Sequence, residues 1–388
     1  MNNYSIIYLA IIVMLISCSS DDYIVVPEVE EIGAPEIFFK GADLSYVNEM
    51  EDCGATYFDE NGVSFDPFTT ISNKGGNIVR VRIWNNPSDF TSYSTIEDVE
   101  KTIQRAKTQN LKVLLDFHYS DRWADPGTQV TPAAWSGVQN NLGFLGDSLF
   151  NYTYNILKRL NDGNLLPDMV QVGNETNTEI LQSEDEQGLT INWQRNSKLI
   201  NRGIEAVRTA SKDLGQDIGV MLHIAQPENA LFWFKQAKDN GVTDFDWIGL
   251  SYYPSPTNFG LNNSGDYENL GTAIELLREI HNKQVMIVET AYPFTLENAD
   301  TANNVLGSGN LIEGYDATQQ GQLDYLTKLI DVTKKAGGAG VIYWEPAWVS
   351  TDCTTLFGIG SNWDNATLYD DTGVPTLGMN FLSINTNF

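Results

Sequence analysis

Short apolar runs alternate with longer stretches of helical spacing from residue 37 to the C-terminus. The short runs consist mostly of Val, Ile, Leu and aromatic residues, as is typical of strands that are covered on both faces. We expect strands at Ile37–Leu44, Ile78–Trp84, Lys112–Tyr119, Met169–Glu175, Gly219–Ala225, Trp247–Tyr253, Val285–Ala291 and Gly340–Pro346. We expect helices at Thr95–Gln109, Phe144–Leu160, Arg195–Lys212, Leu231–Asn240, Tyr267–Asn282 and Thr318–Ala336. This alternation predicts a parallel sheet joined by crossover helices.

Eight such units in succession predict a fold of the α/β class, a single closed (β/α)8 TIM barrel that spans residues 37–388. An open, doubly wound sheet is the alternative fold. Such sheets usually have a glycine-rich phosphate-binding loop directly after the first strand. The first predicted strand leads instead into Gly41-Ala42-Asp43-Leu44-Ser45. The barrel is therefore favoured, and its active site is expected at the carboxyl ends of the strands.

Residues 1–17 are predicted to be a signal peptide. The apolar run Ile6–Ile16 is too short to span a bilayer comfortably, and it is followed by Ser17-Cys18. This arrangement resembles a bacterial lipoprotein signal, in which the cysteine, here Cys18, is acylated. Met1–Ser5 lacks the usual Lys or Arg, and an ordinary signal peptide with an incidental cysteine is the alternative.

Residues 18–36 are polar, acidic and interrupted by Pro27 and Pro35, which predicts a flexible tether. Its start, Ser19-Ser20-Asp21-Asp22, resembles the surface-export signal of Bacteroidetes lipoproteins. The resemblance implies an exported protein that is anchored in the outer membrane through Cys18 and exposed at the cell surface.

Polar and aromatic residues occur where the predicted strands end. Because these ends meet at one mouth of a barrel, we expect their side chains to line one site. Besides two glutamates, the candidate substrate-binding residues are Asp43, Arg82, Trp84, Asp116, His118, Asn174, His223, Tyr252, Trp344 and Trp348.

Glu175 and Glu289 are expected at the ends of the fourth and seventh strands, roughly across the mouth from each other. Glycoside hydrolysis needs two carboxylic groups, one that donates a proton to the leaving oxygen and one that is ionised. Asn174 is placed to hold a sugar 2-hydroxyl. Tyr252 is expected to donate a hydrogen bond to Glu289 and keep it ionised, and His223 is expected to tune Glu175.

Three further carboxylates at strand ends, Asp43, Asp116 and Glu345, are candidates for ordinary salt bridges. Glu345 is the main competitor for a catalytic role. Its neighbours Trp344 and Trp348 favour a sugar platform instead.

The charge of the chain narrows the choice of ligand. With 51 acidic and 23 basic side chains, the net charge is −28, so binding to nucleic acid or to an anionic membrane by electrostatics is excluded. A neutral ligand is favoured, although the acidity could serve solubility alone. Three histidines are too few for a Cys/His zinc array, and the chain has no Walker loop and no Gly-x-Ser-x-Gly elbow.

Cys53 and Cys353 remain once Cys18 is set aside. They follow the first and last predicted strands, which are neighbours in a closed barrel. An exported protein permits a disulfide between them, and two buried free thiols are the alternative.

Several motifs resemble the family-53 glycoside hydrolases, the endo-β-1,4-galactanases, over about residues 38–385. Val172-Gly173-Asn174-Glu175 and Val288-Glu289-Thr290 also resemble the paired motifs of the larger clan that retains anomeric configuration. The motifs closer to the family are Lys40-Gly41-Ala42-Asp43-Leu44-Ser45, Arg80-Val81-Arg82-Ile83-Trp84-Asn85, Leu115-Asp116-Phe117-His118-Tyr119-Ser120-Asp121, Trp123-Ala124-Asp125-Pro126-Gly127, Gly249-Leu250-Ser251-Tyr252-Tyr253-Pro254, Glu289-Thr290-Ala291-Tyr292-Pro293 and Tyr343-Trp344-Glu345-Pro346-Ala347-Trp348.

The resemblance implies that Glu175 is the proton donor and Glu289 the nucleophile, with no cofactor for catalysis. It implies β-1,4-galactan, the neutral side chain of type I rhamnogalacturonan, as the substrate. Bacterial members often hold a structural Ca²⁺ between the loops after strands 7 and 8. The matching oxygen ligands are Asn298, Asp300, Asn304, Ser361 and Asp364. Asn298 stands where an Asp is usual and Ala302 offers no ligand, so an ordinary Asn-rich loop without an ion is the alternative.

Two other functions stay open at this point. One is a different polysaccharide hydrolase of the same clan, such as a mannanase or a cellulase. The other is a non-catalytic glycan-binding lipoprotein, which the presence of both Glu175 and Glu289 disfavours. We expect a monomer. Endo action is favoured over exo action, but cleft-lining loops decide between them, and the sequence does not define their shape.

Overall fold

A computed structural model describes residues 32–33, 35–256, 258–262 and 268–386. The predicted signal peptide, Cys18 and most of the tether lie outside the described residues. The tether was expected to run to residue 36, but Ile32 N donates to Asn282 Oδ1 (2.7 Å) and Arg278 Nη2 donates to Gly33 O (3.2 Å). These contacts tie residues 32 and 33 to the barrel, whose compact unit begins at Ile32.

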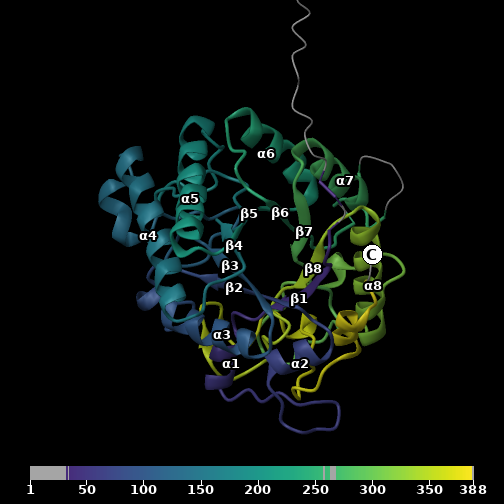
Figure 1. Ribbon diagram of the computed structural model, residues 1–388. Coiled ribbons are helices and arrows are strands. Elements are labelled where there is room, and N and C mark those ends of the chain that lie inside the picture. Colours follow the sequence, from purple (N-terminus) through teal and green to yellow (C-terminus); the bar gives the residue numbers. More distant parts are fainter. Residues whose placement is uncertain (1–31, 34, 257, 263–267, 387–388) are drawn as a thin grey trace, which may run out of the picture. The chain divides into compact units, whose positions relative to one another are not determined.

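The predicted barrel is confirmed (Figure 1). Eight parallel strands pair in chain order, and β8 pairs with β1 to close the sheet. The strands are β1 Phe39–Asp43, β2 Ile78–Ile83, β3 Lys112–Phe117, β4 Met169–Val172, β5 Gly219–Ala225, β6 Trp247–Ser251, β7 Gln284–Glu289 and β8 Gly340–Tyr343. Most end earlier than predicted, so several site residues belong to the loops that follow.

The helices stand around the barrel and cover its outer face (Figure 1). The six predicted ones are present as α3 Ile96–Thr108, α4 Leu142–Asp162, α5 Trp193–Leu214, α6 Pro227–Asp239, α7 Leu270–His281 and α8 Gln319–Lys335. Five of them begin at a side-chain cap, Thr95, Asn141, Asn192, Asn269 or Thr318, which accepts a hydrogen bond from a first-turn amide.

Shorter elements were not predicted, because they lack a full period of apolar spacing. They are α1 Val47–Asp52, α2 Pro67–Asn73, the hairpin β9 Thr354–Thr355 with β10 Gly358–Ile359, and the 3-10 turns Pro87–Asp89, Ala133–Val138, Ser308–Asn310, Asp364–Ala366 and Leu377–Ser383. None of the helices within the described ranges is long and apolar enough to cross a membrane.

The interior of the barrel has an apolar layer near its amino end and a polar layer above it. The apolar layer consists of Ile78, Leu114, Met169, Met221, Met286, Val288 and Ile342. Two residues further along the strands, the inward side chains become Arg80, Asp116, Gln171 and His223, all at most 1% exposed. A period of two along each strand therefore separates a water-free base from the chemistry at the mouth.

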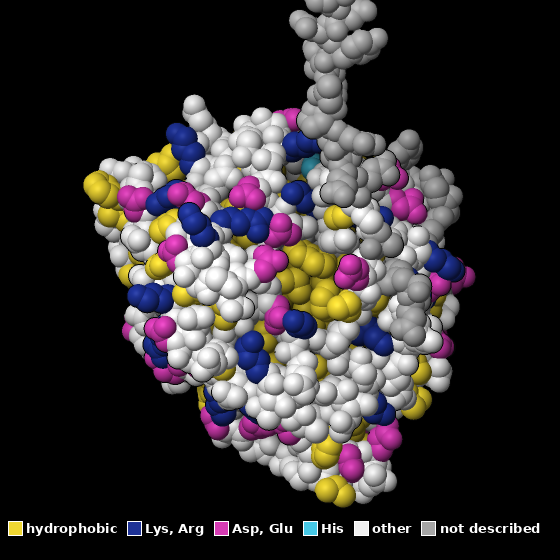
Figure 2. All heavy atoms as spheres, viewed as in Figure 1, with side chains coloured by type: hydrophobic (Ala, Val, Ile, Leu, Met, Phe, Trp, Pro, Cys, Tyr) yellow, Lys and Arg dark blue, Asp and Glu magenta, His cyan; other side chains and the backbone are white. Residues whose placement is uncertain are grey.

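The amino ends of the strands are closed by packing. Figure 2 looks onto this face and shows hydrophobic side chains at its centre, with charged side chains around them. Phe39 and Trp247 pack edge to face at 6.0 Å against the apolar layer.

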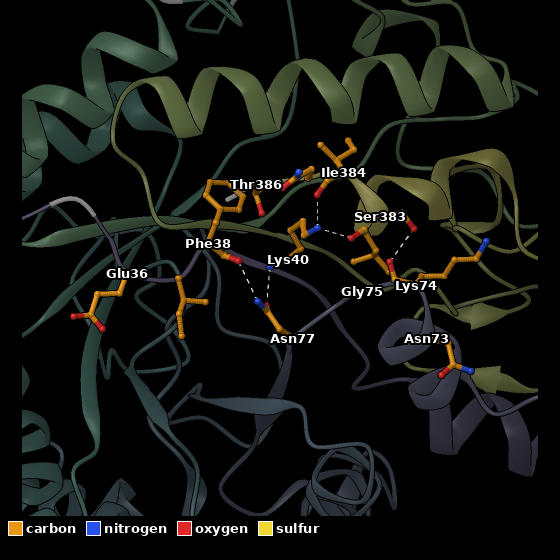
Figure 3. A pocket seen from close by; sticks show the side chains of 13 residues that line it. Glu36, Phe38, Lys40, Asn73, Lys74, Gly75, Asn77, Ser383, Ile384 and Thr386 are labelled. Carbon is orange, nitrogen blue, oxygen red and sulfur yellow. Dashed lines mark hydrogen bonds between the residues drawn. The ribbon is translucent and has the colours of Figure 1, made fainter. Parts of the chain in front are cut away.

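A cavity of about 790 Å³ lies beside this base, where the segment before β1 meets the C-terminal residues (Figure 3). Lys40 Nζ donates to the carbonyls of Leu382 and Ile384 at 2.5 Å each. Among the lining residues that the structure describes, Glu36 is the one carboxylate. A lone carboxylate at the amino end is no hydrolytic pair, so we place the chemistry at the opposite end.

The permitted disulfide is present. Cys53 ends α1 and Cys353 lies in the loop after β8, and the two are bonded with a Cα–Cα distance of 5.6 Å. The bridge joins the loops that follow the two strands at which the barrel closes.

Candidate active site

The two predicted catalytic glutamates meet at the mouth of the barrel. A carboxylate oxygen of Glu175, one of Glu289 and a ring nitrogen of His223 all lie within 4.8 Å of one another. Two carboxyl groups this close match the spacing of glycosidases that retain configuration, in which the groups are about 5 Å apart.

A tight backbone turn aims Glu175. After β4 the chain passes through Gly173 at φ 89°, where an added Cβ would lie 2.6 Å from Thr176 Cγ2. Glu175 itself has φ 42°, a left-handed conformation that a residue other than glycine rarely adopts. Such strain persists where surrounding contacts hold it, and it concentrates at functional sites.

A register shift aims Glu289. Leu250 of β6 pairs with Ile287, but the next residue, Ser251, pairs with Glu289, so Val288 is an extra residue on β7. Simple alternation after the inward Met286 and Val288 would turn Glu289 outward. The bulge turns its side chain into the mouth instead.

Glu289 is held by one cation and one hydroxyl. Arg80 Nη1 lies 2.8 Å from its Oε1, and Tyr253 Oη donates to its Oε2 at 3.0 Å. Burial raises the pKa of Glu289 to about 7, and the guanidinium of Arg80 and the hydroxyl of Tyr253 oppose that rise. The ionised carboxylate is therefore stabilised more strongly at Glu289 than at Glu175.

Glu175 is placed to keep its proton. Burial and the negative charge of Glu289 raise its pKa to about 8, whereas the hydrogen bond from Ser251 lowers it. Ser251 Oγ donates to Glu175 Oε1 at 2.5 Å and lies 2.9 Å from His223 Nε2. His223 can therefore affect the pKa of Glu175 as predicted, because Ser251 links the two side chains by hydrogen bonds.

His223 is neutral and fully buried. Burial and the charge of Arg80 hold its pKa well below the usual range. Because Ser251 gives its proton to Glu175, His223 Nε2 is the donor to Ser251, and Nδ1 accepts from Gln171 Nε2 (2.9 Å) and from Glu175 N (3.3 Å). With both nitrogens engaged and the Arg80 guanidinium beside Glu289, this group is unsuited to a metal ion.

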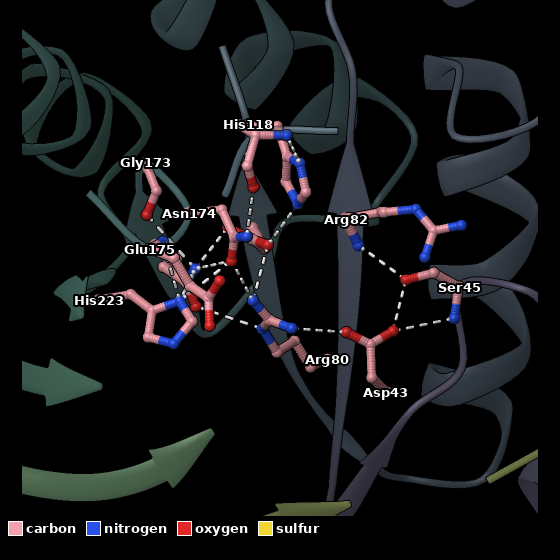
Figure 4. A network of polar contacts seen from close by, with 12 residues as sticks. Asp43, Ser45, Arg80, Arg82, His118, Gly173, Asn174, Glu175 and His223 are labelled. Atoms are coloured by element: carbon pink, nitrogen blue, oxygen red, sulfur yellow. Dashed lines mark hydrogen bonds and ion pairs between the residues drawn. The ribbon is translucent and has the colours of Figure 1, made fainter. Parts of the chain in front are cut away.

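Arg80 organises the polar layer (Figure 4). It forms ion pairs with Asp43 and Asp116 as well as Glu289, each at 2.8 Å. Its Nη2 also donates to Asn174 Oδ1 at 2.8 Å. Asp43 and Asp116 are therefore salt-bridge partners, as one of the two sequence interpretations held.

Asn174 and His118 are fixed by neighbours. Asn174 Nδ2 donates to Ala124 O at 2.7 Å, which leaves its second amide hydrogen for the mouth. His118 Nδ1 accepts from Trp84 Nε1 (3.2 Å) and from Ala124 N (3.1 Å), so its Nε2 donates to Asp116 (3.0 Å). Trp84, at 2% exposure, is part of this buried framework.

Glu345 is a buried salt-bridge residue. Its Oε1 lies 2.6 Å from Arg82 Nη1, and its Oε2 accepts from Tyr46 N at 3.1 Å. Arg82 in turn lies over the rings of Tyr46 (4.2 Å) and Trp123 (4.6 Å). With both oxygens engaged and no exposed surface, Glu345 cannot compete for the catalytic role.

The expectation for Tyr252 is wrong. Its hydroxyl donates to Phe259 O at 2.9 Å, and Tyr253 supplies the contact to Glu289. Trp348 is only 2% exposed and stacks on Tyr46 at 4.2 Å, so its ring is packed between protein groups. Trp344 is partly exposed and packs edge to face on Trp363 at 4.6 Å.

Sequence reasoning missed Arg80, Gln171, Ser251 and Tyr253 as site residues. The signal for them was present, because each lies two residues along the chain from another inward residue. Arg80 follows Ile78, Gln171 follows Met169, and Tyr253 follows Ser251. Strict alternation would have selected them.

The five predicted calcium ligands lie in facing loops after β7 and β8. Asn304 Nδ2 donates to Asn298 Oδ1 and to Asp364 Oδ1, at 2.7 Å each. Asp300 accepts from Ala302 N (2.6 Å) and Ser361 N (2.7 Å). The hydroxyl of Ser361 donates to Trp348 O. The Asn304 amide thus sits where an ion could bridge Asn298 and Asp364.

Known proteins agree with this geometry. The sequence model of glycosyl hydrolase family 53 matches residues 39–382. An arabinogalactan endo-β-1,4-galactanase of Cellvibrio japonicus (strain Ueda107) is 54% identical over 337 residues, which are 86% of this chain and 87% of that protein. An endo-β-1,4-galactanase of Bacillus subtilis (strain 168) is 35% identical over 329 residues, 82% of this chain and 72% of that protein.

A solved structure of the GH53 catalytic domain of Ignisphaera aggregans has a TM-score of 0.78 and 30% identity to this chain, and the match covers 90% of this chain and 96% of that one. A fungal β-1,4-galactanase structure has a TM-score of 0.74 and 26% identity, with 89% and 99% covered. The chain belongs to glycosyl hydrolase family 53.

Proposed function

We propose that this protein is an endo-β-1,4-galactanase that hydrolyses β-1,4-galactan with retention of anomeric configuration. The observation that carries the proposal is the pair Glu175 and Glu289, whose carboxylate oxygens lie within 4.8 Å in the mouth of the barrel. The names of the family relatives from Cellvibrio japonicus and Bacillus subtilis supply the substrate class.

The reaction proceeds in two displacements. Protonated Glu175 gives its proton to the glycosidic oxygen while ionised Glu289 attacks the anomeric carbon, so the leaving chain departs with a free hydroxyl. Glu175, now ionised, then takes a proton from water, and the hydroxide attacks the anomeric carbon and frees Glu289. Two inversions give net retention.

The fixed polar layer supports both steps. Arg80 and Tyr253 stabilise the carboxylate of Glu289 before attack and after release. Asn174 offers its second amide hydrogen to the sugar 2-hydroxyl, a contact that strengthens in the transition state. The net charge of −28 suits a substrate without charge.

Substitution of each glutamate tests the proposal. Glu289→Ala and Glu175→Gln should each lower kcat on linear galactan by at least about 10³-fold, because each removes one arm of the mechanism. Glu297→Gln, an exposed glutamate in the loop after β7, is the matched control and should retain full turnover.

Reducing-sugar release from purified galactan, glucan and mannan identifies the polymer. NMR of the first anomer formed reports retention, and early intermediate oligomers report endo attack. Turnover of mannan or glucan but not galactan would replace this proposal with the other hydrolases of the clan. Undiminished cleavage by Glu289→Ala would reject Glu289 as the nucleophile. A wild-type chain that binds galactan and cleaves none of the polymers would indicate a glycan-binding barrel.

We further propose that the loops after β7 and β8 bind a structural Ca²⁺. Asn298, Asp364 and Asn304 supply converging oxygens once the Asn304 amide turns by half a rotation. Two observations support this. The Oδ1 of Asn304 is buried without a hydrogen-bond partner in the described part of the chain, and Asp300 lies near enough to raise the pKa of Asp364 further. Hard oxygen ligands of this kind suit Ca²⁺.

We also propose that the protein is a monomeric outer-membrane lipoprotein of the Bacteroidetes surface-exposed type, acylated at Cys18. The support is the sequence Leu15-Ile16-Ser17-Cys18 followed by Ser19-Ser20-Asp21-Asp22. Cells grown with a labelled fatty acid should label the wild-type chain and not Cys18→Ala. Equal labelling of the two would reject the anchor.

A further inference from the structure

A groove of about 620 Å³ opens between the start of α6 and the loop that leads into α5, outside the site described above. These two helices are neighbours in Figure 1. One wall is a face of α6 that carries Glu228, Asn229, Phe232, Trp233 and Gln236, and the other is the segment Gly188–Ile191 with Trp193.

The walls combine exposed rings with polar groups. Phe232 is 68% exposed although it lies in the middle of α6, and Trp193 is only partly buried, against Trp233 at 5.3 Å. On the same wall Asn229 is exposed and Gln236 is partly exposed. Flat apolar rings beside polar side chains suit the faces and hydroxyls of sugars.

The groove adjoins the turn that carries Glu175. Asn177, Thr178 and Pro126 line it, and Asn177 lies two residues after Glu175. The side chain of Asn177 is fixed by two bonds to Ala225, its Nδ2 donating to Ala225 O and its Oδ1 accepting from Ala225 N. Thr178 Oγ1 donates to Pro126 O at 3.1 Å. The segment that aims the proton donor therefore also forms the floor of the groove.

The position of the groove decides which part of the substrate it meets. In a retaining glycosidase the acid lies beside the departing oxygen and the nucleophile lies across the anomeric carbon from it. The groove adjoins Glu175 through the loops after β4 and β5, whereas Glu289 ends β7 on the opposite side of the barrel. A chain that leaves past Glu175 is directed into the groove.

We infer that this groove binds the leaving-group portion of the galactan chain, with Phe232 stacked on a galactosyl unit beyond the bond that is cut. The inference rests on the proposed galactanase function and extends it. Binding on both sides of the bond selects internal bonds of a long chain over its ends.

Phe232→Ala tests the role of the ring, and Phe232→Tyr is the conservative variant. Phe144→Ala is the matched control, because Phe144 is 62% exposed near the start of α4 and does not line the groove. Each variant is assayed on linear galactan and on 4-nitrophenyl β-1,4-galactobioside, whose leaving group contains no sugar.

We expect Phe232→Ala to lower kcat/KM on galactan roughly tenfold and to leave the aryl substrate within about twofold. Phe232→Tyr and Phe144→Ala should match the wild type on both. In a second measurement, added galactotriose intercepts the galactobiosyl–enzyme formed from the aryl substrate. Phe232→Ala should lower the ratio of transfer to hydrolysis, because the acceptor occupies the same groove.

Equal galactan kinetics and equal transfer ratios for Phe232→Ala and Phe144→Ala would overturn the inference and leave the galactanase function intact. An equal loss on galactan and on the aryl substrate would also overturn it, since a general defect would then explain both. A wild-type enzyme that turns over neither substrate would overturn the proposed function and this inference together.

Discussion

At the scale of single residues, the hydroxyl of Tyr253 controls how far the nucleophile stays ionised. It lies 3.0 Å from Glu289 Oε2, whereas the adjacent Tyr252 donates to Phe259 O. Of these two neighbouring tyrosines, Tyr253 bonds to Glu289 and Tyr252 does not, so Tyr252 is a suitable control for substitutions of Tyr253.

Tyr253→Phe should move the acidic limb of the pH profile of kcat/KM to higher pH by roughly half a unit or more. Loss of the donor raises the pKa of Glu289, so the carboxyl stays protonated, and unable to attack, up to a higher pH. The alkaline limb reports deprotonation of Glu175 and should stay in place. Tyr252→Phe should leave both limbs unchanged. A shifted alkaline limb with a fixed acidic one would contradict this assignment.

The same residues show what the sequence could reveal about the site. The meeting of Glu175 and Glu289 at the mouth of the barrel was predictable, because both follow the carboxyl ends of strands. The contact of Tyr253 with Glu289 was predictable too, because Ser251 points inward and alternation then selects Tyr253 in place of Tyr252. The ion pairs of Arg80 with three carboxylates depend on strand register, which composition does not encode.

At the scale of elements, the catalytic side chains are aimed by irregularities in otherwise regular strands. Gly173 and the left-handed Glu175 end β4, and the extra residue Val288 turns Glu289 inward on β7. The apolar runs located all eight strands, but seven of the eight ends were predicted one to three residues too late. Bulges and left-handed turns depend on contacts with neighbouring strands, so a period of two along one strand cannot reveal them.

The loops after β7 and β8 give a prediction at this scale. Saturating Ca²⁺ should raise the melting temperature of the wild type by roughly 3 to 4 °C over the value in EGTA. Asp364→Asn should abolish most of that difference, because it removes the negative charge that accepts hydrogen bonds from Ala299 N and Asn304 Nδ2. Glu297→Gln lies in the same loop, is exposed, and should respond like the wild type. Identical melting in Ca²⁺ and EGTA would reject the ion.

At the scale of the whole molecule, the bridge between Cys53 and Cys353 should stabilise the barrel without serving the chemistry. The residues it joins are 300 positions apart, so its loss frees a very long loop in the unfolded chain. We expect the double variant Cys53→Ser/Cys353→Ser to lose about 2 to 5 kcal/mol, which lowers the melting temperature by roughly 3 to 7 °C.

Turnover of galactan by that variant at 25 °C should equal that of the wild type, since neither cysteine contacts the polar layer around Arg80. The measurement pairs calorimetry with initial rates. Unchanged melting together with reduced turnover would show that the bridge acts on the mouth and not on stability.

The barrel closes only when its last strand, β8, pairs with its first, β1, so closure comes at the end of synthesis. Arg80 is synthesised early, Glu175 midway and Glu289 late. The sheet keeps two unpaired edges until Tyr343 of β8 pairs with Ala42 of β1. No piece of the chain that ends before β8 contains a complete set of reacting groups on a closed sheet. Hydrolysis should therefore switch on in one step, when the final strand docks, and a nascent or truncated chain should show none of it.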